Sequence, residues 1–180
     1  MSDRVRVLSD LDDDALGRLV AGLGGKPFQA RQISHWIWKH GAGDFDAMRN
    51  VPARLRVALA TEWRVLGATV TRADLAADGT EKLLIGLADG EAVECVIIPD
   101  GERTTLCIST QVGCPVGCVF CASGLGGVRR NLSTGEIAEQ VLLARARLAA
   151  GQRLTNLVVM VMGEPMLNHD NLLPALHRIH

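Results

Sequence analysis

The stretch QVGCPVGCVFCASG, residues 111–124, places three of the chain's five cysteines, Cys114, Cys118 and Cys121, within eight residues. Such crowding has three explanations: a metal ligand set, part of a disulfide framework, or chance. The choice matters for the whole chain, because a metal centre and a disulfide framework belong to different compartments and different folds.

The sequence outside this stretch argues against the disulfide framework. The N-terminal residues MSDRVRVLSDLDDDAL are charged and lack the apolar segment of a secretory signal. No apolar run approaches the roughly 18 residues of a membrane helix, and the longest, LVVMVM at 157–162, has the length of a strand. We therefore expect a cytoplasmic protein without a membrane partner, whose thiols are reduced. The odd number of cysteines agrees.

The overall composition predicts a folded core. The chain of 180 residues is about one domain long, with room for a small second unit. Hydrophobic residues make up 48% and charged residues 22%, which is typical of globular proteins. The net charge of -1 argues against general polyanion binding, yet it allows a local basic face.

Residues 1–64 are predicted to form a small helical domain. Apolar spacing indicates a helix over 16–23 that ends at Gly24-Gly25, and a second helix from Pro27 to about Gly41. A third helix is expected to begin at Asn50 and run through Trp63. Six basic side chains between residues 26 and 56 form either a solvated helix surface or a patch that faces nucleic acid: Lys26, Arg31, Lys39, Arg49, Arg54 and Arg56.

Residues 65–100 are predicted to form antiparallel hairpins. Two Asp-Gly pairs, at 78–79 and 89–90, separate short β-prone runs. In the last run, EAVECVIIP, Glu94 lies among apolar neighbours, with Val93 and Cys95 on the opposite face. Its carboxylate is either paired or available for proton transfer, and the spacing alone favours a structural role.

Residues 101–180 follow the order of a repeating β/α unit. Ser133 and Glu136 form a capping box at a helix start, and Leu132 and Ile137 fit the accompanying hydrophobic staple. The run NLVVMVMGEP, 156–165, is predicted to be a fully buried strand of a parallel sheet. In such folds the chemistry gathers at the C-terminal ends of strands, where both the cysteine loop and Gly163-Glu164 would lie.

The cysteine spacing favours an iron–sulfur cluster over zinc, with chance left open. Structural zinc takes four ligands, commonly as two pairs, whereas Cys95 and Cys107 are isolated and the histidines are distant in sequence. A 4Fe–4S cluster held by three cysteines leaves one iron without a protein ligand, where a small molecule can bind.

Longer motifs carry a family resemblance. CPVGCVFC, 114–121, matches the C-x3-C-x2-C signature of radical S-adenosylmethionine enzymes, and MGEP, 162–165, resembles their motif for the methionyl amine. CISTQVGCPVGCVFCASG, RRNLSTGEIAEQV and MGEPMLNHDNLLPAL resemble the RlmN/Cfr family of radical S-adenosylmethionine RNA adenine methyltransferases. Residues 22–56, GLGGKPFQARQISHWIWKHGAGDFDAMRNVPARLR, are similar to that family's N-terminal accessory domain.

This resemblance implies a fold of class α/β. The expected parts are a helical RNA-binding accessory domain over 1–64, a β-hairpin extension over 65–100, and an incomplete radical S-adenosylmethionine (β/α) partial barrel over 101–180. The family's methyl-accepting cysteine, near its C-terminus, has no match here. The chain is therefore expected to be the N-terminal part of a longer enzyme, or a truncated relative. By itself, it is expected not to transfer methyl groups.

The resemblance also implies residue roles. Cys114, Cys118 and Cys121 would be the metal ligands of a 4Fe–4S cluster, and a cofactor-binding position falls on Gly163 and Glu164. Two catalytic roles carry over as well. Glu94 would accept a proton, although the spacing alone favours a structural role for this carboxylate. Cys107, otherwise a plain buried thiol, would resolve the RNA–enzyme adduct through a transient disulfide.

The implied reaction is S-adenosylmethionine-dependent methylation of an adenine in 23S rRNA, and in tRNA, at carbon 2 through a methyl-cysteine. An electron donor such as flavodoxin is an expected partner, and DNA is not.

Three positions bear on the specificity. The carbon-8 enzymes of the Cfr type carry a cysteine where Val112 stands. Val161 and Ser123 stand where the family usually has other residues. Alternatives are carbon-8 methylation, another radical chemistry, and a metal-stabilised RNA-binding module. Arg129 and Arg130 are either phosphate contacts or a solvated pair.

Overall fold

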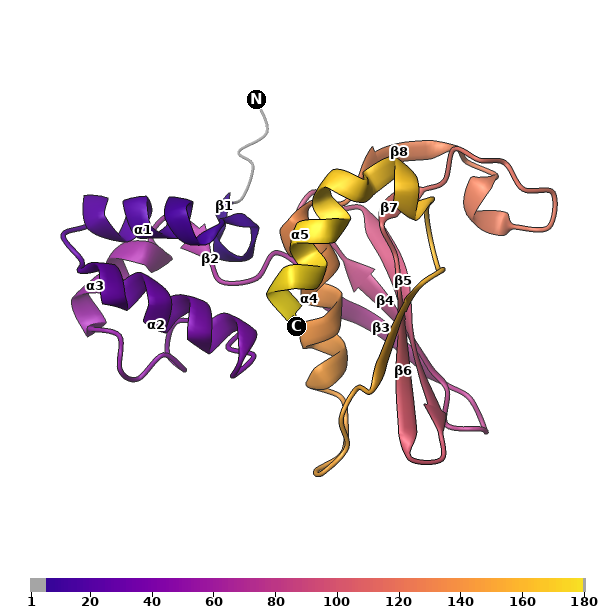
Figure 1. Ribbon diagram of the computed structural model, residues 1–180, viewed down its shortest axis with the longest axis horizontal. Coiled ribbons are helices and arrows are strands. Elements are labelled where there is room, and N and C mark those ends of the chain that lie inside the picture. Colours follow the sequence, from indigo (N-terminus) through magenta and orange to yellow (C-terminus); the bar gives the residue numbers. More distant parts are fainter. Residues whose placement is uncertain (1–5, 180) are drawn as a thin grey trace. The chain divides into compact units, whose positions relative to one another are not determined.

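The computed structural model describes residues 6–179 and divides the chain into two compact units, residues 1–67 and 68–180 (Figure 1). The first unit is mainly helical. Its elements are β1 (Arg6–Val7), η1 (Leu8–Asp10), α1 (Asp13–Gly22), α2 (Pro27–Trp38), α3 (Ala53–Ala60) and β2 (Trp63–Arg64). Asp12 caps α1 by accepting a hydrogen bond from the Ala15 amide at 2.6 Å. Its core is made of fully buried apolar side chains from all three helices, among them Leu16, Val20, Ile33, Ile37 and Leu59.

The third helix differs from its prediction at both ends. It begins at Ala53 and ends at Ala60, whereas a helix from Asn50 through Trp63 was expected. Trp63 instead lies in β2, which pairs in parallel with β1. The Asn50 side chain accepts a hydrogen bond from the Trp36 indole and does not cap the helix. Pairing between segments distant in sequence thus overrides the helical spacing.

The second unit is built on one five-stranded sheet with the order β3-β4-β5-β6-β9. Its strands are β3 (Thr69–Leu75), β4 (Glu81–Gly86), β5 (Ala92–Asp100), β6 (Arg103–Ile108) and β9 (Asn156–Val159). The first four are antiparallel neighbours, and β6 and β9 run parallel. The hairpins turn at Gly79 (φ 85°) and Gly90 (φ 88°), as predicted. The hairpin strands before residue 100 thus share a sheet with the strands after it.

The remaining elements are two helices and a small second sheet. They are β7 (Gln111–Gly113), η2 (Ala122–Gly124), β8 (Val128–Asn131), α4 (Thr134–Arg145), η3 (Pro165–Asn168) and α5 (His169–Ile179). The predicted capping box is present, because the Ser133 hydroxyl accepts from the Glu136 amide and the Glu136 carboxylate accepts from the Ser133 amide.

The second unit combines one five-stranded sheet with helices, and the expected α/β class is confirmed. No helix within residues 6–179 is long and apolar enough to cross a membrane.

The two faces of the sheet differ. Helices α4 and α5 lie on one side of it, and α4 packs against β6 (Figure 1). Alternate residues on that side, including Leu83, Val93, Cys95 and Leu106, are fully buried. The opposite face carries the partly exposed residues of β5.

The strand predicted over 156–165 is shorter and less buried than expected. Its parallel pairing is confirmed, but β9 covers only Asn156–Val159 and lies at the edge of the sheet. Met160, directly after it, is 75% exposed. A continuous apolar run indicates burial on both faces, and the described residues cover this strand with helices on one face only.

Candidate functional site

A short two-stranded stem carries the cysteine loop. β7 and β8 pair antiparallel, with Gln111 opposite Asn131, and enclose residues 114–127. The Cys114 amide donates to the Gly127 carbonyl at 3.2 Å and closes the base of the loop. Gly113 has φ of 78°, and a Cβ there would lie 2.0 Å from the Gly127 carbonyl oxygen. Because only glycine allows this close approach, Gly113 lets the two ends of the loop meet at its base.

The three thiols lie along this loop. Cys118 is exposed, and Cys114 and Cys121 are half-buried. Hydrogen bonds from the side chain and backbone of Ser123 lower the pKa of Cys121, which favours its thiolate. Within residues 6–179, no three His, Cys, Asp or Glu side chains are gathered closely enough to hold a metal ion. The donor set fits a cluster in its thiol chemistry and spacing, although the side chains are not assembled around a centre.

The Gly163-Glu164 turn lies against the stem of the cysteine loop. Gly163 has φ of 101°, and a Cβ there would approach the Gln111 Cβ to 2.7 Å. The Glu164 amide donates to Gln111 Oε1 at 2.8 Å. The Glu164 carboxylate accepts from the Met166 amide at 3.1 Å and caps η3. The structure thus brings this turn to Gln111, three residues before Cys114.

Glu94 and Cys107 lie on the face of the sheet opposite the helices. Cys107 pairs with Val96, so both residues share a face with Glu94, while Cys95 points to the helix side. The Glu94 side chain is 38% exposed, and its Oε1 lies 3.1 Å from Lys82 Nζ. The carboxylate is therefore ion-paired on an accessible face.

The two sheet cysteines are both buried. Burial raises the pKa of Cys107, which a hydrogen bond from the Met160 backbone partly opposes. Burial, reinforced by Cys107 and Glu81, raises the pKa of Cys95 to about 12. All five cysteines are free thiols. The structure therefore lends no support to a disulfide at Cys107.

A buried polar segment, residues 109–110, connects the strand that carries Glu94 with the segment after β9, and the sequence alone did not single it out. Ser109 and Thr110 follow β6 directly and are fully buried. Ser109 Oγ donates to the Glu94 carbonyl at 2.6 Å and accepts from the Met162 amide at 3.1 Å. Gln140 bonds both backbone groups of Ser109, at 2.9 and 3.0 Å. The polar run Ser-Thr-Gln, immediately after an apolar strand, could have indicated this buried segment from the sequence.

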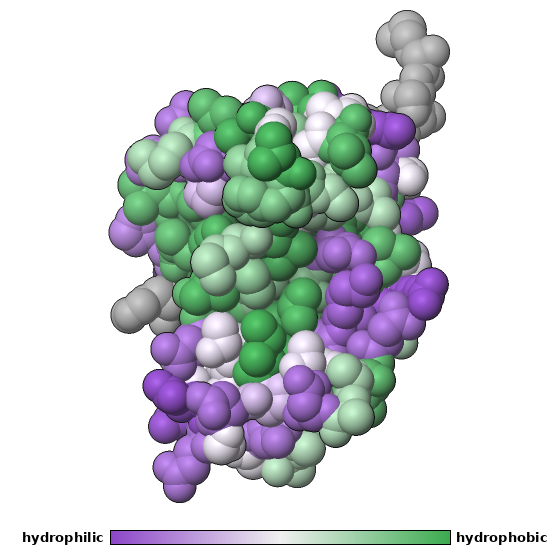
Figure 2. All heavy atoms as spheres, turned by 90° about the vertical axis from the view of Figure 1, so that its right-hand side faces the viewer, coloured by the Kyte–Doolittle hydropathy of each residue, from purple (hydrophilic) through white to green (hydrophobic). Residues whose placement is uncertain are grey.

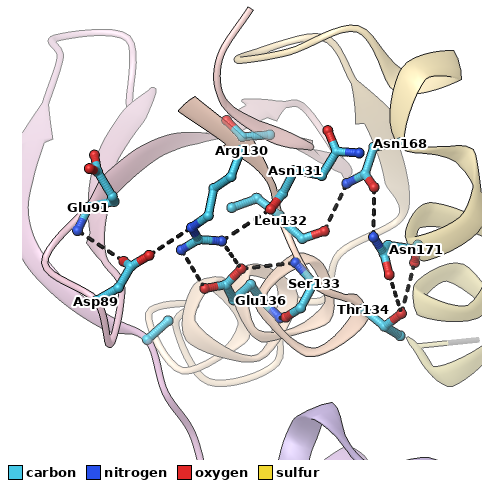
Figure 3. Close-up of polar contacts among 12 residues, drawn as sticks. Asp89, Glu91, Arg130, Asn131, Leu132, Ser133, Thr134, Glu136, Asn168 and Asn171 are labelled. Atoms are coloured by element: carbon cyan, nitrogen blue, oxygen red, sulfur yellow. Dashed lines mark hydrogen bonds and ion pairs between the residues drawn. The ribbon is translucent and has the colours of Figure 1, made fainter. Parts of the chain in front are cut away.

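The arginine pair of β8 takes part in ion pairs. Arg130 Nη1 lies 2.7 Å from Glu136 Oε2, and its Nε lies 2.7 Å from Asp89 Oδ2 (Figure 3). Hydrogen bonding with Glu136 raises the pKa of Arg130. Arg129 pairs with Glu91 at 2.6 Å but stays exposed. Arg130 is therefore a structural residue that ties the β4–β5 turn to the start of α4.

The helix-free side of the second unit carries many exposed apolar side chains. Figure 2 shows hydrophobic residues over its upper and central parts, bordered by hydrophilic ones. The exposed large apolar residues of the cysteine loop and of the segment after β9 are Val116, Val119, Phe120, Leu125, Met160, Met166 and Leu167. They lie in the same two segments as the three loop cysteines and the Gly163-Glu164 turn.

Known proteins resemble the chain along most of its length. Residues 7–65 match the family model described as the ribosomal RNA large subunit methyltransferase N-terminal domain. A probable dual-specificity RNA methyltransferase RlmN of Rhodopirellula baltica is 50% identical over 153 residues, 85% of this chain and 41% of the relative. The dual-specificity RNA methyltransferase RlmN of Solidesulfovibrio magneticus is 43% identical over 176 residues, 96% of this chain and 50% of the relative.

A solved structure shares the fold. The crystal structure of a radical SAM methyltransferase from Sphaerobacter thermophilus is 41% identical, with a TM-score of 0.91 over 97% of this chain and 52% of that one. The chain spans about half the length of the curated relatives it matches. In sequence and in structure, this chain therefore matches about half of an RlmN-type RNA methyltransferase.

Proposed function

We propose that this chain carries the cluster-binding and cofactor-binding part of a radical S-adenosylmethionine RNA methyltransferase. One observation carries the proposal: the stem of the three-cysteine hairpin is bonded to the Gly163-Glu164 turn through Gln111. Both segments follow the C-terminal ends of the parallel strands β6 and β9, where sites of β/α folds gather. On this proposal, residues 101–180 belong to a (β/α) partial barrel, and residues 1–64 form an RNA-binding accessory domain.

We assign the ligand and cofactor roles to the residues that the family resemblance implies. Cys114, Cys118 and Cys121 would hold a 4Fe–4S cluster, and Gly163 and Glu164 would bind S-adenosylmethionine. When bound, the cluster supplies the electron that cleaves the cofactor. The lowered pKa of Cys121 supports a ligand role, because the thiolate is the form that binds metals.

Two residues of the sheet would act on the RNA. The Glu94 carboxylate would accept the ring proton of the adenine, held in place by its ion pair with Lys82. The Cys107 thiol would release the RNA from the enzyme by pairing with the methyl-carrying cysteine. That cysteine is none of the five present here, since Cys95 lies buried on the other face.

The substrate would be an adenine of 23S rRNA, and of tRNA, methylated at carbon 2 in the cytoplasm with an electron donor such as flavodoxin. The names of the relatives support an RNA substrate with dual specificity. The residue that distinguishes the carbon-8 enzymes corresponds to Val112, which is buried in the stem of the cysteine loop. Exposed basic residues of the first unit, such as Arg31 and Arg49, would contact phosphates.

Anaerobic reconstitution with iron and sulfide tests the proposal. The wild-type protein should turn brown and hold about four iron atoms, and each of Cys114→Ala, Cys118→Ala and Cys121→Ala should lose most of them. Cys107→Ala is the matched control, because it removes a thiol that is not a proposed ligand. A colourless protein that holds zinc would contradict the proposal and favour a metal-stabilised RNA-binding module.

The proposed roles on RNA need a separate test. In the complete enzyme, Glu94→Gln and Cys107→Ala should keep the iron and still bind the cofactor. Both should release at least about 100-fold less methylated RNA, in line with the loss of a general base or an essential thiol. Full activity of either variant would point to a radical enzyme of another substrate class.

A further inference from the structure

Three side-chain amides, those of Gln111, Asn131 and Asn168, connect the stem of the cysteine loop to the segment after β9. Gln111 and Asn131 face each other across the stem, and Asn168 ends η3. Gln111 and Asn168 are 2% exposed, so their hydrogen bonds are shielded from water. These three residues are called the amide clamp below.

Gln111 and Asn131 complete a ring of four hydrogen bonds with the turn. The Glu164 amide donates to Gln111 Oε1 at 2.8 Å, and Gln111 Nε2 donates to Asn131 Oδ1 at 2.7 Å. Asn131 Nδ2 donates to the Leu167 carbonyl at 3.1 Å, and the Leu167 amide donates to the Glu164 carbonyl at 3.0 Å, which closes the ring. Both strands of the stem are thereby bonded to the turn that contains Glu164.

Asn168 forms the second half of the clamp. Its Nδ2 donates to the carbonyls of Thr110 and Leu132, at 2.7 and 2.9 Å, which are the residues next to Gln111 and Asn131. Its Oδ1 accepts from Asn171 Nδ2 at 2.8 Å, which fixes the orientation of the amide (Figure 3). Each strand of the stem is therefore held twice by the segment 164–168.

We infer that the amide clamp positions the cysteine hairpin relative to the Gly163-Glu164 turn and so sets how well the cofactor binds. The inference rests on the proposed function, in which the hairpin holds the cluster and the turn holds S-adenosylmethionine. A cofactor that touches both must find them at a fixed separation, and a prearranged site gains affinity because less ordering is left for binding. The clamp residues are positioning residues, since they bond to the two segments and not to the thiols.

The test compares clamp variants of the complete enzyme with a control. Gln111→Met removes both hydrogen bonds of that side chain at similar length, and Asn131→Ala removes an exposed member whose loss should leave the core intact. Asn156→Ala is the control: it removes an exposed side chain of β9 that, among the described residues, accepts a hydrogen bond from the neighbouring Thr155. Three quantities are measured: hydrogen exchange of the Glu164 amide, iron content, and the dissociation constant of S-adenosylmethionine on reconstituted protein.

Both clamp variants should exchange the Glu164 amide about tenfold faster and bind S-adenosylmethionine about tenfold more weakly, with iron content unchanged. The control should match wild type in all three. Faster exchange with unchanged cofactor affinity would overturn the inference alone. So would a parallel loss of iron and of cooperative unfolding in both variants, because the clamp would then only stabilise the fold. A wild type that binds neither iron nor cofactor would instead overturn the proposed function, and the inference with it.

Discussion

On the five-stranded sheet, the burial of a side chain and the partners it meets depend on the face of the sheet on which it lies. Cys95 and Cys107 are on adjacent strands but face opposite sides, and Cys107 shares its face with Glu94. The alternation predicted that Cys95 and Glu94 point apart, and the structure confirms it. Lys82, the ionic partner of Glu94, was not predictable, because it depends on the register between two strands.

Burial of Cys95 predicts a stability loss at alkaline pH. Its pKa is about 12 in the folded protein, whereas in the unfolded chain the thiol deprotonates near its usual value. Between the two values the unfolded state binds fewer protons, so the free energy of unfolding falls as pH rises. In metal-free Cys95→Val the decline should be shallower, by up to about 1.4 kcal/mol per pH unit.

Urea unfolding at several pH values above about 9 measures this difference. Cys118→Ser is the control, because it removes an exposed thiol and should follow the wild-type curve. Parallel curves for wild type and Cys95→Val would show that the Cys95 thiol is not held protonated by burial.

Among the elements, α4 and β8 are joined by a charge network. Arg130 bonds bidentately to Glu136, which also caps α4, and it reaches Asp89 in the β4–β5 turn. The side chains of Arg130 and Glu136 are 24% and 16% exposed, so water screens the pair only in part. The neighbouring pair of Arg129 and Glu91 has a similar distance but an exposed arginine.

These two arginines should therefore differ in their effect on stability. Arg130→Ala leaves two carboxylates without their cation and should lower the free energy of unfolding by about 2 kcal/mol. Arg129→Ala should change it by less than about 0.5 kcal/mol. Urea denaturation of both variants measures the difference. Equal effects would show that Arg130 is no more than a surface contact.

On the scale of the whole molecule, the chain consists of two units, each with its own core. In residues 1–67 the buried side chains come from all three helices, and Ile33 and Leu59 are fully inaccessible. The family match over residues 7–65 covers nearly the same segment. Many domains of about this length fold by themselves.

We expect residues 1–67 expressed alone to give a helical circular dichroism spectrum and a cooperative thermal transition. Ile33→Asp should abolish that transition, because it buries a carboxylate at the centre of the helical core. Phe28→Asp is the control, since Phe28 is 45% exposed. A broad, non-cooperative loss of signal from the unaltered fragment would show that the first unit depends on the rest of the chain.

The sequence by itself determined the local features of this protein. Capping residues, Asp-Gly turns and alternation act between residues a few positions apart, so the helix start at Thr134 and both hairpins could be predicted. The crowding of Cys114, Cys118 and Cys121 is likewise local. Tertiary structure alone decided that Gln111 bonds to Glu164, because these residues are 53 positions apart and meet only where β6 and β9 lie side by side. It also decided how far β9 is buried, since burial depends on which elements cover each face of the sheet.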